Sequence, residues 1–170
     1  EASPAAPALI DLLQGMGSRG EPFRQSHEYY SEALGAMGPD IVPLLIPCMD
    51  NPENHWWVIA VLEHIGTRSD AVVPLLCLLA DSRERMTACA ATESLGRLQA
   101  KPEVTVPVLI RGLRSQIPNV QTAAATALGE IGPPAQAASQ QLTSLIGAHG
   151  NASLRRAVVT ALGDVGVSSE

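Results

Sequence analysis

A short phrase returns five times along the 170-residue chain, and this repetition limits the possible fold more than any other feature. Each copy reads approximately Ala-Leu-Gly, then any residue, an apolar residue and a glycine, as in Thr126–Gly132 and Thr160–Gly166. The copies are anchored by leucines that lie 28, 33, 33 and 34 residues apart: Leu34, Leu62, Leu95, Leu128 and Leu162. A period of about 20 to 50 residues is typical of arrays in which each unit packs only against its neighbours.

A second phrase, Val-Pro-x-Leu, precedes three of these copies, at Val42–Leu45, Val73–Leu76 and Val106–Leu109. Proline is tolerated in the first turn of a helix, and the spaced leucines that follow form a helical stripe. A polar break then precedes an Ala-rich amphipathic stretch. Glycines placed as C-caps close four of these stretches: Gly38, Gly66, Gly132 and Gly166. Each unit is therefore predicted to be a hairpin of two helices, which we call the A helix and the B helix.

The predicted fold is all-α, an α-solenoid of about five such hairpins in a single domain over residues 1–170. The expected repeats are 4–38, 39–66, 67–100, 101–132 and 133–166. Hydrophobic residues make up 46% of the chain and aromatic residues only 3%, so the core must consist mainly of aliphatic side chains. No apolar run approaches the roughly 18 residues that a membrane-spanning helix needs, so we expect no membrane span.

The charge pattern disfavours a nucleic-acid partner. The net charge is −6, and binding to a phosphate backbone depends on clustered Lys and Arg. Residues 1–85 carry −7 and residues 86–170 carry +1, so the first half suits a basic partner or is a solvated acidic face. Cys48, Cys77 and Cys89 form no disulfide or metal-binding spacing and are expected to be buried thiols.

The two phrases together resemble HEAT repeats in their short form, often called HEAT-like or phycobilisome-lyase-type repeats. The resemblance implies a right-handed superhelix whose concave surface is lined by the B helices. It also implies a non-catalytic scaffold that binds another protein. The sequence departs from the family pattern at Glu63, where glycine is usual, and at an insertion over Gly15–Pro22. The chain begins at Glu1 without a methionine, so we expect a processed product or a piece of a longer array.

Helical periodicity sorts the B-helix residues by their distance from the anchoring leucine. Positions −8, −5, −4, 0 and +3 are expected in the core, and positions −6 and −2 are expected to face outward. All five aromatic residues lie between Phe23 and Trp57, so the partner surface is expected mainly in the N-terminal half. Trp57 and Tyr29 are expected to be buried. The predicted partner-binding residues are Glu28, Glu32, His55, Trp56 and Arg156.

No catalytic residue, metal site or cofactor is predicted. The pair His27-Glu28 is similar to the metal-binding helix of deoxyhypusine hydroxylase, a HEAT-like di-iron enzyme, but the equivalent positions in later repeats lack further His-Glu pairs. The alternative to a scaffold is a HEAT-type protein associated with an enzyme activity such as a bilin lyase or isomerase. Self-association through the ends of the array also stays open. A cytoplasmic location is favoured, although an export signal could have been removed.

Overall fold

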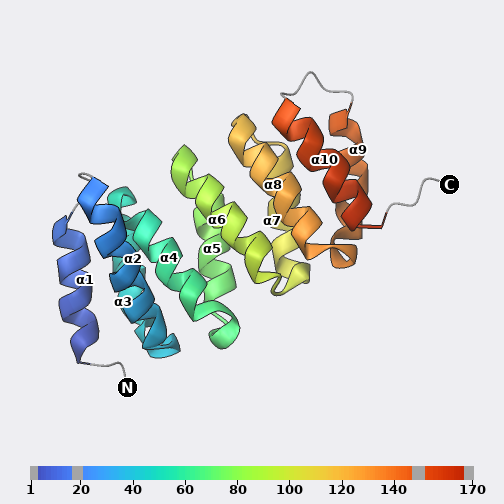
Figure 1. Ribbon diagram of the computed structural model, residues 1–170. Helices are drawn as coiled ribbons and strands as arrows, with labels where there is room; N and C mark the ends of the chain where they lie inside the picture. The colour runs from blue at the N-terminus through green and yellow to red at the C-terminus, as the bar shows by residue number, and fades with distance from the viewer. Residues whose placement is uncertain (1–3, 17–20, 147–151, 167–170) are drawn as a thin grey trace. The chain divides into compact units, whose positions relative to one another are not determined.

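A computed structural model describes residues 4–16, 21–146 and 152–166, and of residues 16 and 21–27 the backbone alone. Within these ranges the chain contains ten α-helices, five short 3-10 helices and no strand (Figure 1). The predicted all-α fold is therefore confirmed. The chain forms two compact units, Glu1–Val72 and Val73–Glu170, each with its own stack of helices.

Unit 1 contains two hairpins, and α2 packs against both α1 and α4. The second hairpin has an A segment of short pieces, with α3 between the 3-10 helices η1 and η2. Pro47 explains this break, because its ring removes one helical hydrogen bond and clashes with the preceding turn. The elements of unit 1 are α1 Ala5–Met16, α2 Glu21–Ala36, η1 Pro39–Ile41, α3 Val42–Leu45, η2 Ile46–Asp50, η3 Pro52–Asn54, α4 His55–Ile65 and η4 Gly66–Arg68.

Unit 2 has its B helices α6, α8 and α10 side by side, as Figure 1 shows, with α8 packed against both of the others. The A helix α7 packs against α8 and α9, and α9 packs against α10. Successive hairpins thus stack in sequence order, as in an α-solenoid. The elements of this unit are α5 Val72–Ala80, α6 Arg85–Leu98, α7 Pro102–Leu113, α8 Pro118–Ile131, η5 Pro133–Ala138, α9 Ser139–Ile146 and α10 Ala152–Asp164.

The helix ends follow the sequence signals in most repeats. All four glycines predicted as C-caps have a positive φ, between 59° and 89°, which a residue without Cβ adopts at little cost. The third B helix has no such glycine and ends at Gln99 in the left-handed region. Its first turn is capped by Glu84, whose carboxylate accepts hydrogen bonds from the backbone N–H groups of Met86 and Thr87. Pro107 was predicted in the first turn of its helix. Because α7 begins at Pro102, Pro107 instead lies inside the helix.

The anchoring leucines form the centre of the core. Leu34, Leu62, Leu95 and Leu128 are at most 1% exposed. Leu162 is only half-buried, because α10 packs against α8 and α9 and no further described helix covers its other side. The predicted right-handed superhelix concerns the whole array and stays a prediction.

Candidate functional site

Three of the predicted partner-binding residues lie exposed in unit 1. Glu28 and Glu32 are on α2, and Trp56 is on the neighbouring α4 with 39% of its surface exposed. The two glutamates lie one turn apart on α2, so their carboxylates share one face of that helix. An exposed tryptophan on one helix and two exposed carboxylates on its neighbour offer a partner both a large apolar contact area and negative charge.

The expected orientation of His55 is wrong. Its side chain is 8% exposed, and Nε2 lies 2.8 Å from the carbonyl oxygen of Met49. His55 is the first residue of α4, so its ring turns back over the 3-10 helix η2 and satisfies a carbonyl at the end of that helix. A buried ring already bonded to its own hairpin contributes to the fold of that hairpin.

Two aromatic residues at equivalent positions behave differently. Trp57 is 1% exposed, as expected, and its indole N–H donates to Oδ1 of the buried Asn54 at 3.3 Å. The expectation that Tyr29 is buried is wrong, since this side chain is 71% exposed. Trp57 can be buried because Asn54 satisfies its polar atom, whereas an exposed phenol keeps its hydroxyl in water. The side chains of Phe23 and His27 lie outside the described residues.

Unit 2 contains two adjoining hollows on its B helices, which we call together the B-helix groove. The larger has a volume of about 530 Å³ and lies over α6 and α8. The smaller, of about 320 Å³, lies over α8 and α10 and includes Arg156, the fifth predicted partner-binding residue. Both hollows are lined by the same four side chains of α8 and α10: Thr122, Thr126, Glu130 and Ser153. The groove therefore crosses all three B helices of the unit.

The expected outward positions line much of this groove. Cys89 and Thr122 at position −6, and Thr126 and Thr160 at position −2, all contribute to its lining. On α6, position −2 counted from Leu95 is Glu93, which also lines the larger hollow, whereas Thr92 at position −3 is 2% exposed. The period of the B helices thus locates the groove.

Close packing between B helices sets the position of two acidic groups in the groove. A Cβ on Gly96 of α6 would lie 2.5 Å from Glu130 Oε2 and 2.6 Å from Ala127 Cα, both on α8. A Cβ on Gly129 of α8 would lie 3.1 Å from Asp164 Oδ2 on α10. Gly96 and Gly129 therefore let the next B helix approach and leave room for a carboxylate above them.

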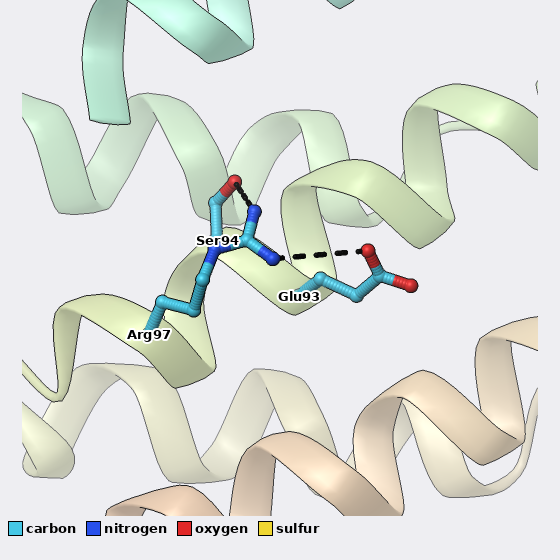
Figure 2. A network of polar contacts seen from close by, with 3 residues as sticks. All are labelled: Glu93, Ser94 and Arg97. Atoms are coloured by element: carbon cyan, nitrogen blue, oxygen red, sulfur yellow. Dashed lines mark hydrogen bonds and ion pairs between the residues drawn. The ribbon is translucent and has the colours of Figure 1, made fainter. Parts of the chain in front are cut away.

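The larger hollow contains a partly solvated ion pair on α6. Figure 2 shows the guanidinium of Arg97 between the side chains of Glu93 and Ser94, with 3.9 Å to Glu93 Oε2 and 3.3 Å to Ser94 Oγ. Both charged side chains are about half exposed, so the pair contributes little to stability. Partial burial raises the pKa of the nearby Glu130, Arg97 lowers it and Glu93 raises it further.

The thiols do not form a reactive or metal-binding site in the described part of the chain. Burial raises the pKa of Cys77 and of Cys89, which keeps both as thiols. Cys48 is buried, accepts a hydrogen bond from Gln14 and donates one to the carbonyl of Leu44. Within the described ranges no three His, Cys, Asp or Glu side chains come together as metal ligands would.

No single helix of the described residues is both long enough and apolar enough to cross a membrane. One bent pair, Glu28–Ala36 with Pro39–Asp50, passes by length and composition only, and its two parts meet at 106°.

Several residues of the groove were missed by the sequence reasoning: Arg85, Met86, Glu130 and Asp164. Glu130 and Asp164 share one signal, since each follows the Ala-Leu-Gly phrase directly, two residues after the anchoring leucine. Arg85 is the first residue of α6 and is found only once the start of that helix is known.

Comparison with known proteins agrees with this architecture. Residues 72–163, more than half of the chain, match the family model of HEAT repeats. No curated protein matches the sequence. HEAT repeats generally mediate protein–protein interactions, and stacked repeats of this kind present extended binding surfaces. The matched residues include α6, α8 and all of α10 except Asp164, and these are the helices that form the B-helix groove. The chain is therefore a member of the HEAT-repeat family.

Proposed function

We propose that this chain is a non-catalytic interaction module that binds another protein on the exposed side of its B helices. The observation that carries the proposal is the B-helix groove, whose two hollows of about 530 and 320 Å³ share side chains across three helices. A surface of this kind fits a partner segment that crosses several repeats. The exposed residues Glu28, Glu32 and Trp56 of unit 1 form a second proposed contact surface.

The lining of the groove supports this role. Its middle is formed by threonine, alanine and cysteine side chains, which offer methyl groups and hydroxyls to a partner. Apart from Glu93, which is paired with Arg97, the charged side chains lie toward its edges, where an interface typically places its polar rim. Such a lining gives orientation and specificity to a bound segment through contacts spread over many side chains.

The test is affinity capture from a lysate of the producing organism, read by mass spectrometry. Thr126 is exposed and lines both hollows, so Thr126→Arg fills the groove with little effect on the core. Thr143 on α9 is also exposed but lies outside the groove, so Thr143→Arg is the matched control. We expect the wild-type chain and T143R to capture the same protein and T126R to bind it more than tenfold more weakly.

Equal capture by T126R and T143R would show that the groove is not the docking surface. An absorbance scan of the captured material tests the enzyme-associated alternative. A pigment that copurifies with the chain in the absence of a protein partner would contradict the scaffold proposal.

A further inference from the structure

The charged side chains of the B-helix groove are sorted by helix end. Arg85 lies at the first residue of α6, and Arg156 lies in the first half of α10. Glu130 and Asp164 lie at the last turns of α8 and α10. None of these four side chains forms an ion pair with another described residue, whereas Glu93 is paired with Arg97. At the carboxylate edge α6 contributes Arg97, whose charge is offset by Glu93, so unpaired negative charge along this edge comes from α8 and α10 and unpaired positive charge lies along the other edge.

The helices themselves reinforce this division. Gly96 of α6 meets the last turns of α8, and Gly129 of α8 meets the last turn of α10, so the three helices run in the same direction with matching ends. The beginning of a helix carries a partial positive charge and its end a partial negative charge. Three parallel B helices thus place their positive ends on the arginine side of the groove and their negative ends on the carboxylate side, with the positive end of α6 already capped by the carboxylate of Glu84.

The band between the two edges is uncharged on α8 and α10, and on α6 it contains Glu93, which is paired with Arg97. Cys89, Ala123, Thr126 and Ala157 lie there, and Met86, 67% exposed, adds a flexible apolar side chain. A complementary partner must carry an apolar stripe with acidic residues along one side and basic residues along the other. An amphipathic α-helix does this, because its apolar face is flanked by two separate rows of side chains. In a bound strand, successive side chains would point alternately toward and away from the groove. Its two flanks would then be formed by backbone atoms, so no rows of charged side chains would lie over the two edges.

We infer that the B-helix groove binds an amphipathic α-helix of a partner protein that crosses α6, α8 and α10. Acidic side chains of this helix lie over the arginine edge, and basic side chains lie over the carboxylate edge. The inference rests on the proposed function and specifies the chemistry of the partner. Binding of a helix in a groove through apolar anchors is an established mode of recognition between proteins.

A displayed library of 18-residue helices tests the inference. The positions of the apolar stripe vary among Ala, Leu, Val, Met and Phe, and each of the two flanking rows varies between Glu, Gln and Lys. The library is selected against the wild-type chain, and T126R, with the groove filled, serves for counter-selection. We expect the enriched helices to carry Glu along one flank and Lys along the other. Enrichment with the same charge on both flanks, or with mixed flanks, would overturn the inference.

Two pairs of neutralising substitutions assign each flank to its edge. Arg85→Gln with Arg156→Gln should remove the preference for Glu and keep the preference for Lys, and Glu130→Gln with Asp164→Asn should do the reverse. Each neutralised contact is expected to weaken the best helix about two- to fivefold at low salt, and less at high salt. If neither pair of substitutions changes the charge preference of the enriched helices, the inference is also overturned.

The outcomes separate the inference from the proposed function. If no helix is enriched on the wild-type chain, but capture of a native protein is still lost in T126R, the groove binds protein and the helical partner is wrong. If T126R captures the native protein normally and no helix is enriched, both are wrong. Melting curves of each variant, compared with the wild-type chain, show that these losses do not arise from unfolding.

Discussion

One substitution made at the same place in several repeats tests how the Ala-Leu-Gly phrase builds this fold. Its glycine is one residue after the anchoring leucine, at Gly96, Gly129 and Gly163 in the last three repeats. A Cβ on Gly96 would lie 2.6 Å from Ala127 Cα and 2.7 Å from Ala127 Cβ. A Cβ on Gly129 would lie 3.1 Å from the Cα of Ala161, and one on Gly163 would meet nothing within 4 Å.

The expected changes in stability follow from two opposing effects. Replacing glycine by alanine inside a helix stabilises that helix by about 0.5 to 1 kcal/mol. Overpacking between closely packed helices costs about 1 to 3 kcal/mol, and the atoms that Gly96 faces include backbone that cannot rotate away. Gly96→Ala should therefore cost about 2 kcal/mol, Gly129→Ala should be close to neutral, and Gly163→Ala should gain about 0.5 kcal/mol near the end of α10.

Thermal unfolding of the full chain measures the series. With about 2 to 4 °C per kcal/mol for a chain of this size, Gly96→Ala should lower Tm by about 4 to 8 °C and Gly163→Ala should raise it by about 1 to 2 °C. Adding Ala127→Gly to Gly96→Ala should restore only part of the loss, because the backbone of residue 127 would still crowd the new methyl group. Equal Tm values for Gly96→Ala and Gly163→Ala would refute the claim that close approach of α6 and α8 requires the glycine.

Three further predictions concern unit 1 and the groove. Arg68→Ala should lower the free energy of unfolding in urea by about 1 to 2 kcal/mol, because Arg68 donates hydrogen bonds to the carbonyls of Gly35, His64 and Ile65 at 2.6 to 2.9 Å; a loss no larger than that of Arg83→Ala would contradict this role. Trp56→Ala should weaken partner binding at least fivefold with a loss of stability near 1 kcal/mol, whereas Trp57→Ala should cost about 3 to 5 kcal/mol, and unchanged binding by Trp56→Ala would exclude that residue from the interface. The raised pKa of Glu130 means that the folded state holds this proton more tightly than the unfolded state, so stability falls as pH rises from about 4.5 through the folded-state pKa. Glu130→Gln should therefore raise Tm at pH 7 and leave it unchanged at pH 3, and an equal gain at both values would rule out this cause.

The fold was predictable because the repeats encode it locally. The anchoring leucines, the Gly C-caps and the helical period specify hairpins that the structure shows, and the family match supports the same assignment. The short A segment of unit 1 was less predictable, since Pro43 and Pro47 together break what reads as one apolar helix. Proline preferences locate a break without specifying which type of helix forms on each side.

The candidate site was less predictable than the fold, and His55 and Tyr29 show why. Helical period places a side chain on a face, but its burial depends on partners from other segments. The His55 ring is buried against the carbonyl of Met49, and the helical period of the B helix gives no sign of this contact. The groove of unit 2 was missed for a related reason. The partner surface was predicted in the N-terminal half because the aromatic residues lie there. The hollows are lined largely by small side chains, which form a groove only when three adjacent helices are packed together.

The same phrase that packs the repeats also sets the chemistry of the groove. In the last two repeats, the residue two positions after the anchoring leucine lies against the glycine of the preceding B helix, and this residue is Glu130 or Asp164. The small glycine brings the helices together and leaves this carboxylate at the groove edge, beside the negative end of its own helix. In the third repeat the equivalent residue is Arg97, which is paired with Glu93. A change of one residue type at this position therefore changes the partner charge that the edge accepts while the packing of the repeats is kept, so repeats of one fold can differ in specificity.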